Sequence, residues 1–512
     1  MSTFPSSHSA GPSATPTGSP TAAEATRARS PHLPTGVVIG LPALVALGFG
    51  LWGIASVSLG RDEIITVSVA RRSLYQIARV LPHMDVVHSA YYLAQHFMVG
   101  LFGYSETAIR MPSVIGTVLA AAAVAALGRK LIDPLGGLLA GLLYAVTPLA
   151  GQYAHFARQY AVVAAGAAAV TLLFVRALER HTKRAYLAYA AGMAALGILH
   201  FFALLLITAH VITVLCGGQW RRRLPPVLAS CAVAMLPVLP IVAVAQGQQQ
   251  LIGWARPPGL PEARDLLIAF AGGPWAAAVV IVLVLIGVLP VRGPRAAVPE
   301  SPVPGIRALA LPWLLCPPVI LFLVSQVHPA YAERYVLLSL PPMVLLAAAG
   351  AVRLRPRLVG MVVVGLALAL MIPQNVHDRR ESSTPDQFRE ASQVVGEHAQ
   401  PGDAILFLPG GRRPIKDAYP QYYTKVTDIA LDKSAVRAAD FSGDEINAAE
   451  LRVRMTHVKR VWLVAFSRYV RCARTVNLSP MSQAKMDILT SGYRRDSCRQ
   501  VIGMTVELFV RP

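Results

Sequence analysis

The stretch TGVVIGLPALVALGFGLWGIASVSLGRDE, residues 35–63, decides the fold class. Residues 35–58 carry no charge, and about 20 such residues are enough to cross a bilayer as a helix. Two adjacent carboxylates, Asp62 and Glu63, follow where that helix is expected to leave the membrane. An ionisable pair at the membrane boundary of a hydrophobic protein points to a functional site. The alternative is a solvated helix N-terminus, in which the two acids only cap the next helix and favour its dipole.

The composition is that of an integral membrane protein with a soluble part. Of 512 residues, 54% are hydrophobic and 14% are charged, and the mean hydropathy is +0.50; soluble domains have roughly 25% charged residues. The net charge of +20 fits arginines at helix ends that face anionic lipid. No basic run is interleaved with aromatic residues, so nucleic acid is not an expected partner. The cysteines show no metal-ligand spacing.

Eleven apolar runs are predicted to span the membrane. They lie near 35–58, 112–128, 135–150, 161–178, 185–200, 202–217, 225–245, 275–291, 308–325, 335–352 and 358–373. Basic clusters such as Arg129-Lys130 separate these runs and are assigned to the cytoplasm. The N-terminal tail, residues 1–34, is then a disordered cytoplasmic segment. Alternation places 60–111, 151–160, 246–274, 326–334 and everything after 373 on the outer face.

The first outer segment, residues 60–111, is predicted to contain two helices. In EIITVSVARRSLYQIARVL, residues 63–81, apolar residues recur at helical spacing while arginines occupy other faces. This pattern predicts one amphipathic helix lying in the membrane interface; the alternative is a helix packed on the soluble domain. Residues 86–102 are predicted to form a second juxtamembrane helix.

Residues 374–512 are predicted to form a small α/β domain outside the cytoplasm. Phe388–His398 reads as a helix, and short apolar runs at Ala404–Leu408, Val461–Phe466 and Val506–Val510 read as strands. The segment is long enough to build its own core.

The cysteines divide into two groups. Cys216, Cys231 and Cys316 lie in or beside apolar runs and are interpreted as small core residues. Cys472 and Cys498 lie after the last span, on the outer side, where disulfides persist. We therefore predict that they form a disulfide; two buried free thiols are the alternative.

Four motifs in order resemble the membrane glycosyltransferases of the GT-C fold. They are the acidic pair Asp62-Glu63; DVVHSAYYLAQHFMVGLFGYSETAIRMPSVIG, residues 85–116; ARQYAVVAAG, residues 157–166; and ERYVLLSLPPMVLLAAAG, residues 333–350. The chain looks closest to the branch with protein O-mannosyltransferases and the aminoarabinose transferase of lipid A, and to actinobacterial mannosyltransferases. One departure is that His88-Ser89-Ala90 stands where the family usually has His-Pro-Pro.

The resemblance implies transfer of a monosaccharide, mannose by analogy, from a polyprenyl-phosphate donor. The acceptor, a protein, a glycan or a lipid of the cell envelope, would lie outside the cytoplasm at the cell membrane. Asp62 is expected to be the general base, and Glu63 to orient the site or to help a metal. A divalent cation is left open as a cofactor, and no other cofactor is expected.

Cationic and aromatic side chains complete the expected substrate site. Arg158 and Arg334 are expected to meet the lipid phosphate; the alternative is that they snorkel to lipid headgroups. The remaining substrate-binding candidates are Arg61, Asp85, His88, Tyr92, Tyr160 and Tyr335. For Asp85 and His88 the alternative is a structural hydrogen bond, and for Tyr92 an interfacial anchor.

Two other functional classes are considered. A transporter or flippase for a lipid-linked envelope precursor would also be polytopic, but no convincing internal repeat of the kind found in many transporters is present. An inactive homologue acting as a partner subunit is the third possibility. The charged residues gather in the outer segments, which favours an enzyme acting at the membrane surface.

Overall fold

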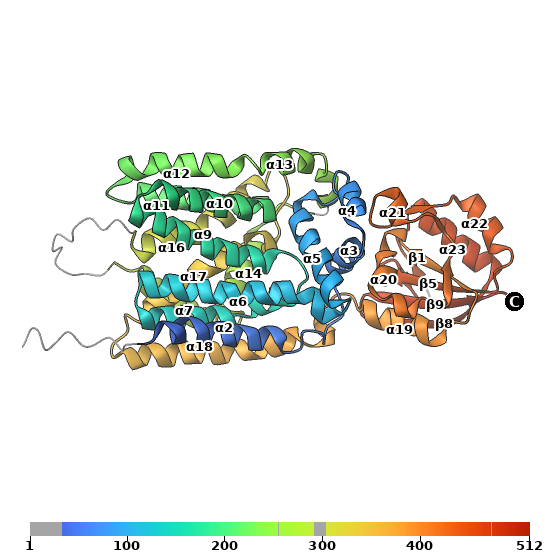
Figure 1. Ribbon diagram of the computed structural model, residues 1–512. Helices are drawn as coiled ribbons and strands as arrows, with labels where there is room; N and C mark the ends of the chain where they lie inside the picture. The colour runs from blue at the N-terminus through green and yellow to red at the C-terminus, as the bar shows by residue number, and fades with distance from the viewer. Residues whose placement is uncertain (1–32, 254, 291–303, 473) are drawn as a thin grey trace, which may run out of the picture.

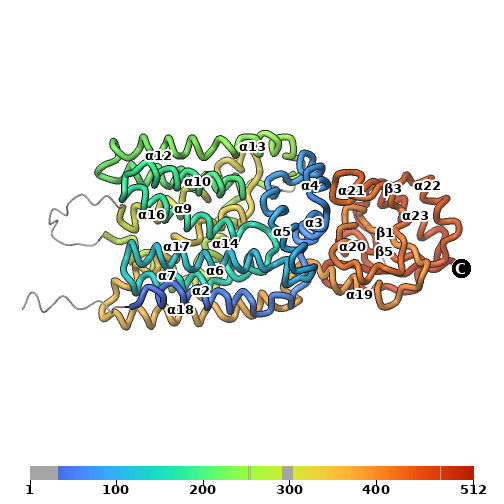
Figure 2. Tube along the Cα trace, viewed as in Figure 1, coloured from blue at the N-terminus to red at the C-terminus, as the bar shows by residue number. Residues whose placement is uncertain are grey.

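The computed structural model describes residues 33–253, 255–290, 304–472 and 474–512. A bundle of helices that run side by side forms one part of the molecule, and an α/β domain forms the other (Figures 1 and 2). A layer of short helices, which includes α3, α4 and α5, lies between them (Figure 1). The predicted N-terminal tail falls outside the described residues except for its last two.

Each of the eleven predicted spans coincides with a helix or a pair of helices. They are α2 Thr35–Leu51, α6 Glu106–Leu131, α7 Pro134–Val146 with α8 Pro148–Ala154, α9 Tyr160–Arg180, α10 Lys183–Leu199, η2 Phe201–Leu205 with α11 Leu206–Leu215, α12 Trp220–Met235 with α13 Leu239–Gln246, α15 Ala277–Val288, α16 Ile306–Val324, η4 Glu333–Ser339 with α17 Leu340–Ala351, and α18 Arg357–Asp378. By length and composition, 5 described helices could cross a membrane, or up to 7 if each bent pair is one span. The number eleven therefore stays a prediction.

Small residues allow close contact between helices of the bundle. A Cβ atom on Gly287 of α15 would lie 2.1 Å from the carbonyl oxygen of Leu346, and one on Gly350 of α17 would lie 1.9 Å from that of Leu283. The backbones of α15 and α17 can approach this closely only because both positions are glycine, as is common where membrane helices pack.

The prediction of a single interfacial helix over 63–81 is wrong. The structure has α3 Arg61–Ala70 and α4 Leu74–Val80, separated at Ser73, whose side chain accepts a hydrogen bond from the Gln76 amide at 3.3 Å. This serine N-cap starts a new helix. Most of α3 is buried because it packs between α5, Ser89–Phe102, and the C-terminal domain. The alternative of a helix packed on the soluble domain therefore describes α3.

The segments that are predicted to lie on the outer face contain further short elements. The helix η1 Val86–His88 precedes α5, and η3 Gln249–Ile252 and α14 Leu260–Phe270 lie in the segment 246–274, for which no helix was predicted. Gln248 connects two of these segments. Its side-chain oxygen accepts from the Val86 amide at 3.0 Å, and its nitrogen donates to the Leu81 carbonyl at 2.8 Å.

The C-terminal domain has the predicted α/β character. The predicted helix is α19 Phe388–His398, and the predicted strands are β1 Asp403–Leu408, β5 Arg460–Phe466 and β9 Met504–Val510. With β2 Val426–Asp428 and β8 Arg494–Val501, they form a sheet in the order β2-β1-β5-β9-β8. The first three strands are parallel, whereas β9 is antiparallel to β5 and β8.

The rest of the domain consists of short elements. These are η5 Glu381–Ser383, η6 Gly410–Arg412, α20 Pro414–Ala418, η7 Pro420–Tyr422, β3 Leu431–Lys433, α21 Ala435–Ala438, β4 Asp444–Glu445, α22 Ala448–Met455, β6 Val470–Arg471, β7 Arg474–Thr475 and α23 Pro480–Gly492. The domain begins only after α18, which extends to Asp378 rather than ending near 373.

One face of the sheet shares a core with the segment that carries the acidic pair. Leu59 and Ile64 belong to the same buried cluster as Phe407 and Trp462 of the sheet. The other face packs its own cluster, which includes Leu451 and Leu489, against α22 and α23. The C-terminal domain is thus joined to the acidic pair by buried apolar contacts.

A disulfide joins Cys472, which follows β6, to Cys498 of β8, with a Cα–Cα distance of 5.7 Å. It ties the β6–β7 hairpin to the edge strand of the sheet.

We expect Cys472→Ser with Cys498→Ser to lower the free energy of unfolding by roughly 3 kcal/mol, because the bond closes a loop with a sequence separation of 26 residues. Thermal unfolding with and without reductant measures this; equal stability of wild type and double variant would contradict it.

Candidate functional site

Three buried or partly buried arginines fix the loop that leads from α2 to the acidic pair. Arg110 of α6 donates to the carbonyls of Ile54, Val57 and Ser58; Arg379, after α18, donates to those of Phe49 and Trp52; and Arg389 of α19 donates to those of Ala55 and Ser56. These carbonyls lie in the last turn of α2 or after it and have no helical partners of their own. The arginines therefore set the path by which the chain enters α3.

Glu63 is held by hydrogen bonds within this buried network. Its carboxylate makes two parallel hydrogen bonds with Arg110, each of 2.9 Å, and accepts from the amides of Ala157 at 2.9 Å and Gly60 at 2.8 Å. Glu63 and Arg110 are both 2% exposed. The expectation that Glu63 orients the site agrees with these contacts. The expectation that it acts as a catalytic group or metal ligand does not, because its acceptor positions are occupied by donors of the chain.

Asp62, in contrast, presents its carboxylate to a cavity. Its side chain is 36% exposed and lies between two arginines. Arg158 Nη2 is 4.0 Å from Asp62 Oδ1, and Arg334 Nη2 is 3.9 Å from Asp62 Oδ2. These distances indicate electrostatic contact rather than tight hydrogen bonds. The carboxylate therefore lies beside two cations and remains accessible to an incoming group.

Arg158 stands between Asp62 and a second acidic residue, Asp85. Its Nη1 atom is 3.6 Å from Asp85 Oδ2 and donates to the Tyr92 hydroxyl at 3.0 Å, and this hydroxyl donates to Asp85 Oδ2 at 2.9 Å. The Arg158 side chain is 3% exposed, so the alternative of snorkelling to lipid headgroups does not apply to it. Tyr92 is fully buried and positions Arg158 instead of anchoring the protein at the interface.

Aromatic residues pack around this charge cluster. The rings of His88, His200 and Tyr335 all contact Tyr160, with centroid distances of 6.5, 5.7 and 6.0 Å. The Arg334 guanidinium lies 5.3 Å from the ring centroid of Tyr335. His88 contacts the Gln159 side chain, and burial, followed by Arg158 and His200, lowers its pKa well below the usual value. His88 is therefore neutral at physiological pH and serves as a structural partner.

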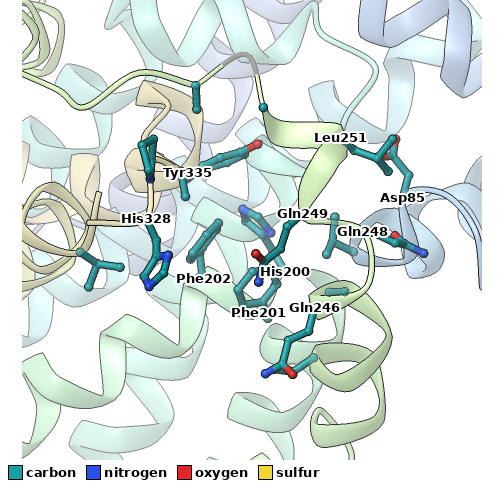
Figure 3. Close-up of a pocket in the computed structure, with 18 residues that line it drawn as sticks. Asp85, His200, Phe201, Phe202, Gln246, Gln248, Gln249, Leu251, His328 and Tyr335 are labelled. Carbon is teal, nitrogen blue, oxygen red and sulfur yellow. The ribbon is translucent and has the colours of Figure 1, made fainter. Parts of the chain in front are cut away.

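Two cavities meet the charge cluster from different sides. The first, of about 430 Å³, is lined by Asp85, Tyr335 and apolar residues that include Phe201, Phe202 and Val324. We call it the apolar cavity; Figure 3 shows Asp85 and Gln248 on one side of it and His328 on the other.

The second, the polar cavity, has a volume of about 750 Å³. Its lining includes Asp62, Arg334, Arg61 and residues of the C-terminal domain. Arg158 links the linings of the two cavities, because it contacts Asp85 of the apolar cavity and Asp62 of the polar cavity.

Comparisons with known proteins identify the fold. The sequence profile described as dolichyl-phosphate-mannose-protein mannosyltransferase matches residues 88–244. ArnT from Cupriavidus metallidurans bound to undecaprenyl phosphate has a similar structure, with a TM-score of 0.59, 13% identity, and coverage of 92% of this chain and 98% of that chain. This chain has the fold of the GT-C membrane glycosyltransferases.

The structure of ArnT from Cupriavidus metallidurans in the apo state gives a similar result, with a TM-score of 0.57, 13% identity, and coverage of 92% of this chain and 97% of that chain. At this identity the likeness establishes the fold alone. No curated protein matches the sequence.

The structure brings some of the predicted site residues together and separates others. Asp62, Arg61 and Arg334 line the polar cavity, and Asp85 and Tyr335 line the apolar cavity. His88, Tyr92 and Tyr160 line neither cavity and support those that do. Arg61 pairs with Asp386 of the C-terminal domain, so it holds this domain in place as well as lining the site.

Arg110, Arg379 and Arg389 were not predicted to support the site. Arg110 lies in the quoted stretch 85–116, but its partners lie in a loop about fifty positions earlier in the chain. Only the tertiary structure shows that contact.

The described residues give no carboxylate cluster for a metal. The single group of three suitable side chains in this part of the chain consists of Cys472, Cys498 and Glu507, and its two cysteines are bonded to each other.

Proposed function

We propose that this glycosyltransferase moves a monosaccharide, with mannose as the first choice, from a polyprenyl-phosphate donor to an acceptor hydroxyl outside the cytoplasm. The observation that carries the proposal is the position of Asp62, an accessible carboxylate that lines the polar cavity between Arg158 and Arg334. Arg158 also contacts Asp85, which lines the apolar cavity. The donor class is supported by the undecaprenyl phosphate bound to ArnT and by the dolichyl-phosphate-mannose in the family description.

The two cavities suit the two substrates. A polyprenyl chain needs an apolar surface, and the apolar cavity offers Phe201, Phe202 and Val324. The phosphate would lie beside Arg158 and Arg334, which can stabilise the negative charge that grows on the leaving group. The acceptor would enter through the polar cavity.

The reaction then needs one proton transfer. The acceptor hydroxyl oxygen bonds to C1 of the sugar while the bond from C1 to the phosphate oxygen breaks. Asp62 accepts the hydroxyl proton, and the polyprenyl phosphate leaves with the bonding electron pair. A positioned base of this kind contributes about 10²–10⁴-fold to the rate.

Transfer of label tests the proposal. Purified protein is given polyprenyl-phosphate mannose or glucose, each radiolabelled in the sugar, together with crude cell-envelope acceptors. We expect label to move from lipid to an acceptor fraction with one of these sugars. Donor that binds to the protein but keeps its label with every acceptor fraction would contradict a transferase function.

We propose that the face with Asp62 and the C-terminal domain is extracytoplasmic and that the N-terminus is cytoplasmic. Arginine clusters at alternate ends of the predicted spans support this orientation. A reporter that is active only outside the cytoplasm, fused after Pro512, is expected to be active. A well-expressed but silent fusion would contradict an odd number of spans.

Removal of either arginine beside Asp62 is expected to weaken donor binding. We predict that Arg158→Ala and Arg334→Ala each raise the KM for the polyprenyl-phosphate sugar by at least 30-fold, since loss of one partner of a desolvated charge pair costs about 2–5 kcal/mol. Arg264→Ala is the matched control, because its side chain is 71% exposed. An arginine whose loss leaves donor KM unchanged is not part of the donor site.

A further inference from the structure

Three arginines converge on one aromatic ring at the wall of the polar cavity. The guanidinium carbons of Arg412, Arg61 and Arg468 lie 4.2, 4.6 and 5.1 Å from the ring centroid of Phe466. All three arginines line the cavity that contains Asp62. We call these three residues the arginine cluster. Phe466 ends β5, and Arg412 ends η6 after β1, so the C-terminal domain supplies most of this wall.

The positive charge of the arginine cluster is poorly balanced by the chain. Arg61 pairs with Asp386, whereas no ion pair is formed by Arg412 or Arg468 with any residue that the structure describes. The Arg412 Nε atom is buried without a hydrogen-bond partner. Contact with an aromatic face stabilises a guanidinium, but it leaves the N–H donors at its edge unused.

The electrostatics at Arg412 are unfavourable without a further partner. Burial, followed by the neighbouring charges of Arg61 and Arg468, lowers its pKa to about 10. A group with two or more oxygen acceptors and a negative charge would relieve both the repulsion and the missing hydrogen bonds. Phosphate and carboxylate groups have these properties.

We propose that the arginine cluster binds an anionic group, a phosphate or a carboxylate, carried by the acceptor close to its reacting hydroxyl. This inference rests on the proposed transferase function and deepens it by naming the acceptor chemistry. The cluster shares the polar cavity with Asp62, which is to take the acceptor proton. The polyprenyl chain of the donor, by contrast, is assigned to the apolar cavity, and the donor phosphate to Arg158 and Arg334. The C-terminal domain thus selects acidic glycans or glycolipids over neutral ones.

A binding measurement that needs no turnover tests the cluster. Inorganic pyrophosphate is titrated into the full-length protein by calorimetry at constant ionic strength. We expect saturable binding to wild type that is weakened about tenfold by Arg412→Gln or Arg468→Gln and about 100-fold by the double variant, because each charge-assisted hydrogen bond contributes this much. Arg499→Gln is the control, since Arg499 is exposed on the edge strand β8. The melting temperature without pyrophosphate shows whether each variant is folded.

Two further experiments distinguish an anion of the acceptor from the donor phosphate and from free phosphate. Binding of polyprenyl phosphate to the double variant is expected to equal that to wild type; a parallel loss would assign the cluster to the donor and overturn the proposal. In the transfer reaction, pyrophosphate is expected to compete with the acceptor. Inhibition that is not competitive with the acceptor would indicate a site for free phosphate and would also overturn it. Absence of pyrophosphate binding to wild type contradicts the inference while leaving sugar transfer intact.

Discussion

Asp62→Asn is expected to lower the turnover number by about 10²–10⁴-fold while leaving donor binding and the melting temperature near those of wild type. The amide keeps the shape of the side chain but cannot accept the acceptor proton. Because the Asp62 side chain is 36% exposed and its arginine contacts are 3.9–4.0 Å long, little folding energy depends on its charge. Single-turnover kinetics with bound donor separates the chemical step from binding.

A matched control uses another acidic residue of the outer segments. Asp265→Asn removes an exposed carboxylate whose partner is the neighbouring Arg264, and we expect it to have no effect on turnover. If Asp62→Asn turns over at nearly the wild-type rate, Asp62 is not the general base. If it loses turnover together with donor binding, its charge serves to hold the arginines instead.

Glu63→Gln is expected to unfold the site, although it changes the residue next to Asp62. The substitution leaves the Arg110 guanidinium, in a residue that is 2% exposed, without its charge partner. Breaking a buried pair in this way costs about 3–5 kcal/mol. We expect a large fall in the melting temperature in detergent and a loss of the protein from the monodisperse fraction.

A double-mutant cycle distinguishes this structural role from a catalytic one. Arg110→Met combined with Glu63→Gln is expected to be less destabilised than the sum of the single variants, because neither charge is then left unpaired. The control is Glu450→Gln, which breaks an exposed pair with Arg454 and is expected to change stability by less than about 1 kcal/mol. A Glu63→Gln protein that melts like wild type but does not turn over would show that Glu63 acts in the chemistry.

The sequence by itself predicted a polytopic helical protein with a C-terminal α/β domain, and it predicted the positions of the main helices and strands. Continuous apolar runs favour helices, which satisfy their backbone hydrogen bonds internally, and a helix or a pair of helices appears at every predicted span. The short continuous apolar runs after residue 400 predicted β1, β5 and β9, whose residues are almost all buried. Two strands were not predicted. Strand β2 is short, and the edge strand β8 has the charged pattern Arg-Arg-Asp-Ser-Cys-Arg, which lacks apolar alternation.

Only the tertiary structure decided which member of the acidic pair presents an accessible carboxylate to the polar cavity. Adjacent residues on a helix point about 100° apart, so Asp62 and Glu63 diverge as soon as α3 forms. Glu63 turns toward Arg110, which comes from a helix 47 positions later, and Asp62 turns toward Arg158 and Arg334. Local sequence could identify both carboxylates as candidates. It could not assign their roles, because burial and charge partners come from segments that meet only when the bundle and the C-terminal domain pack together.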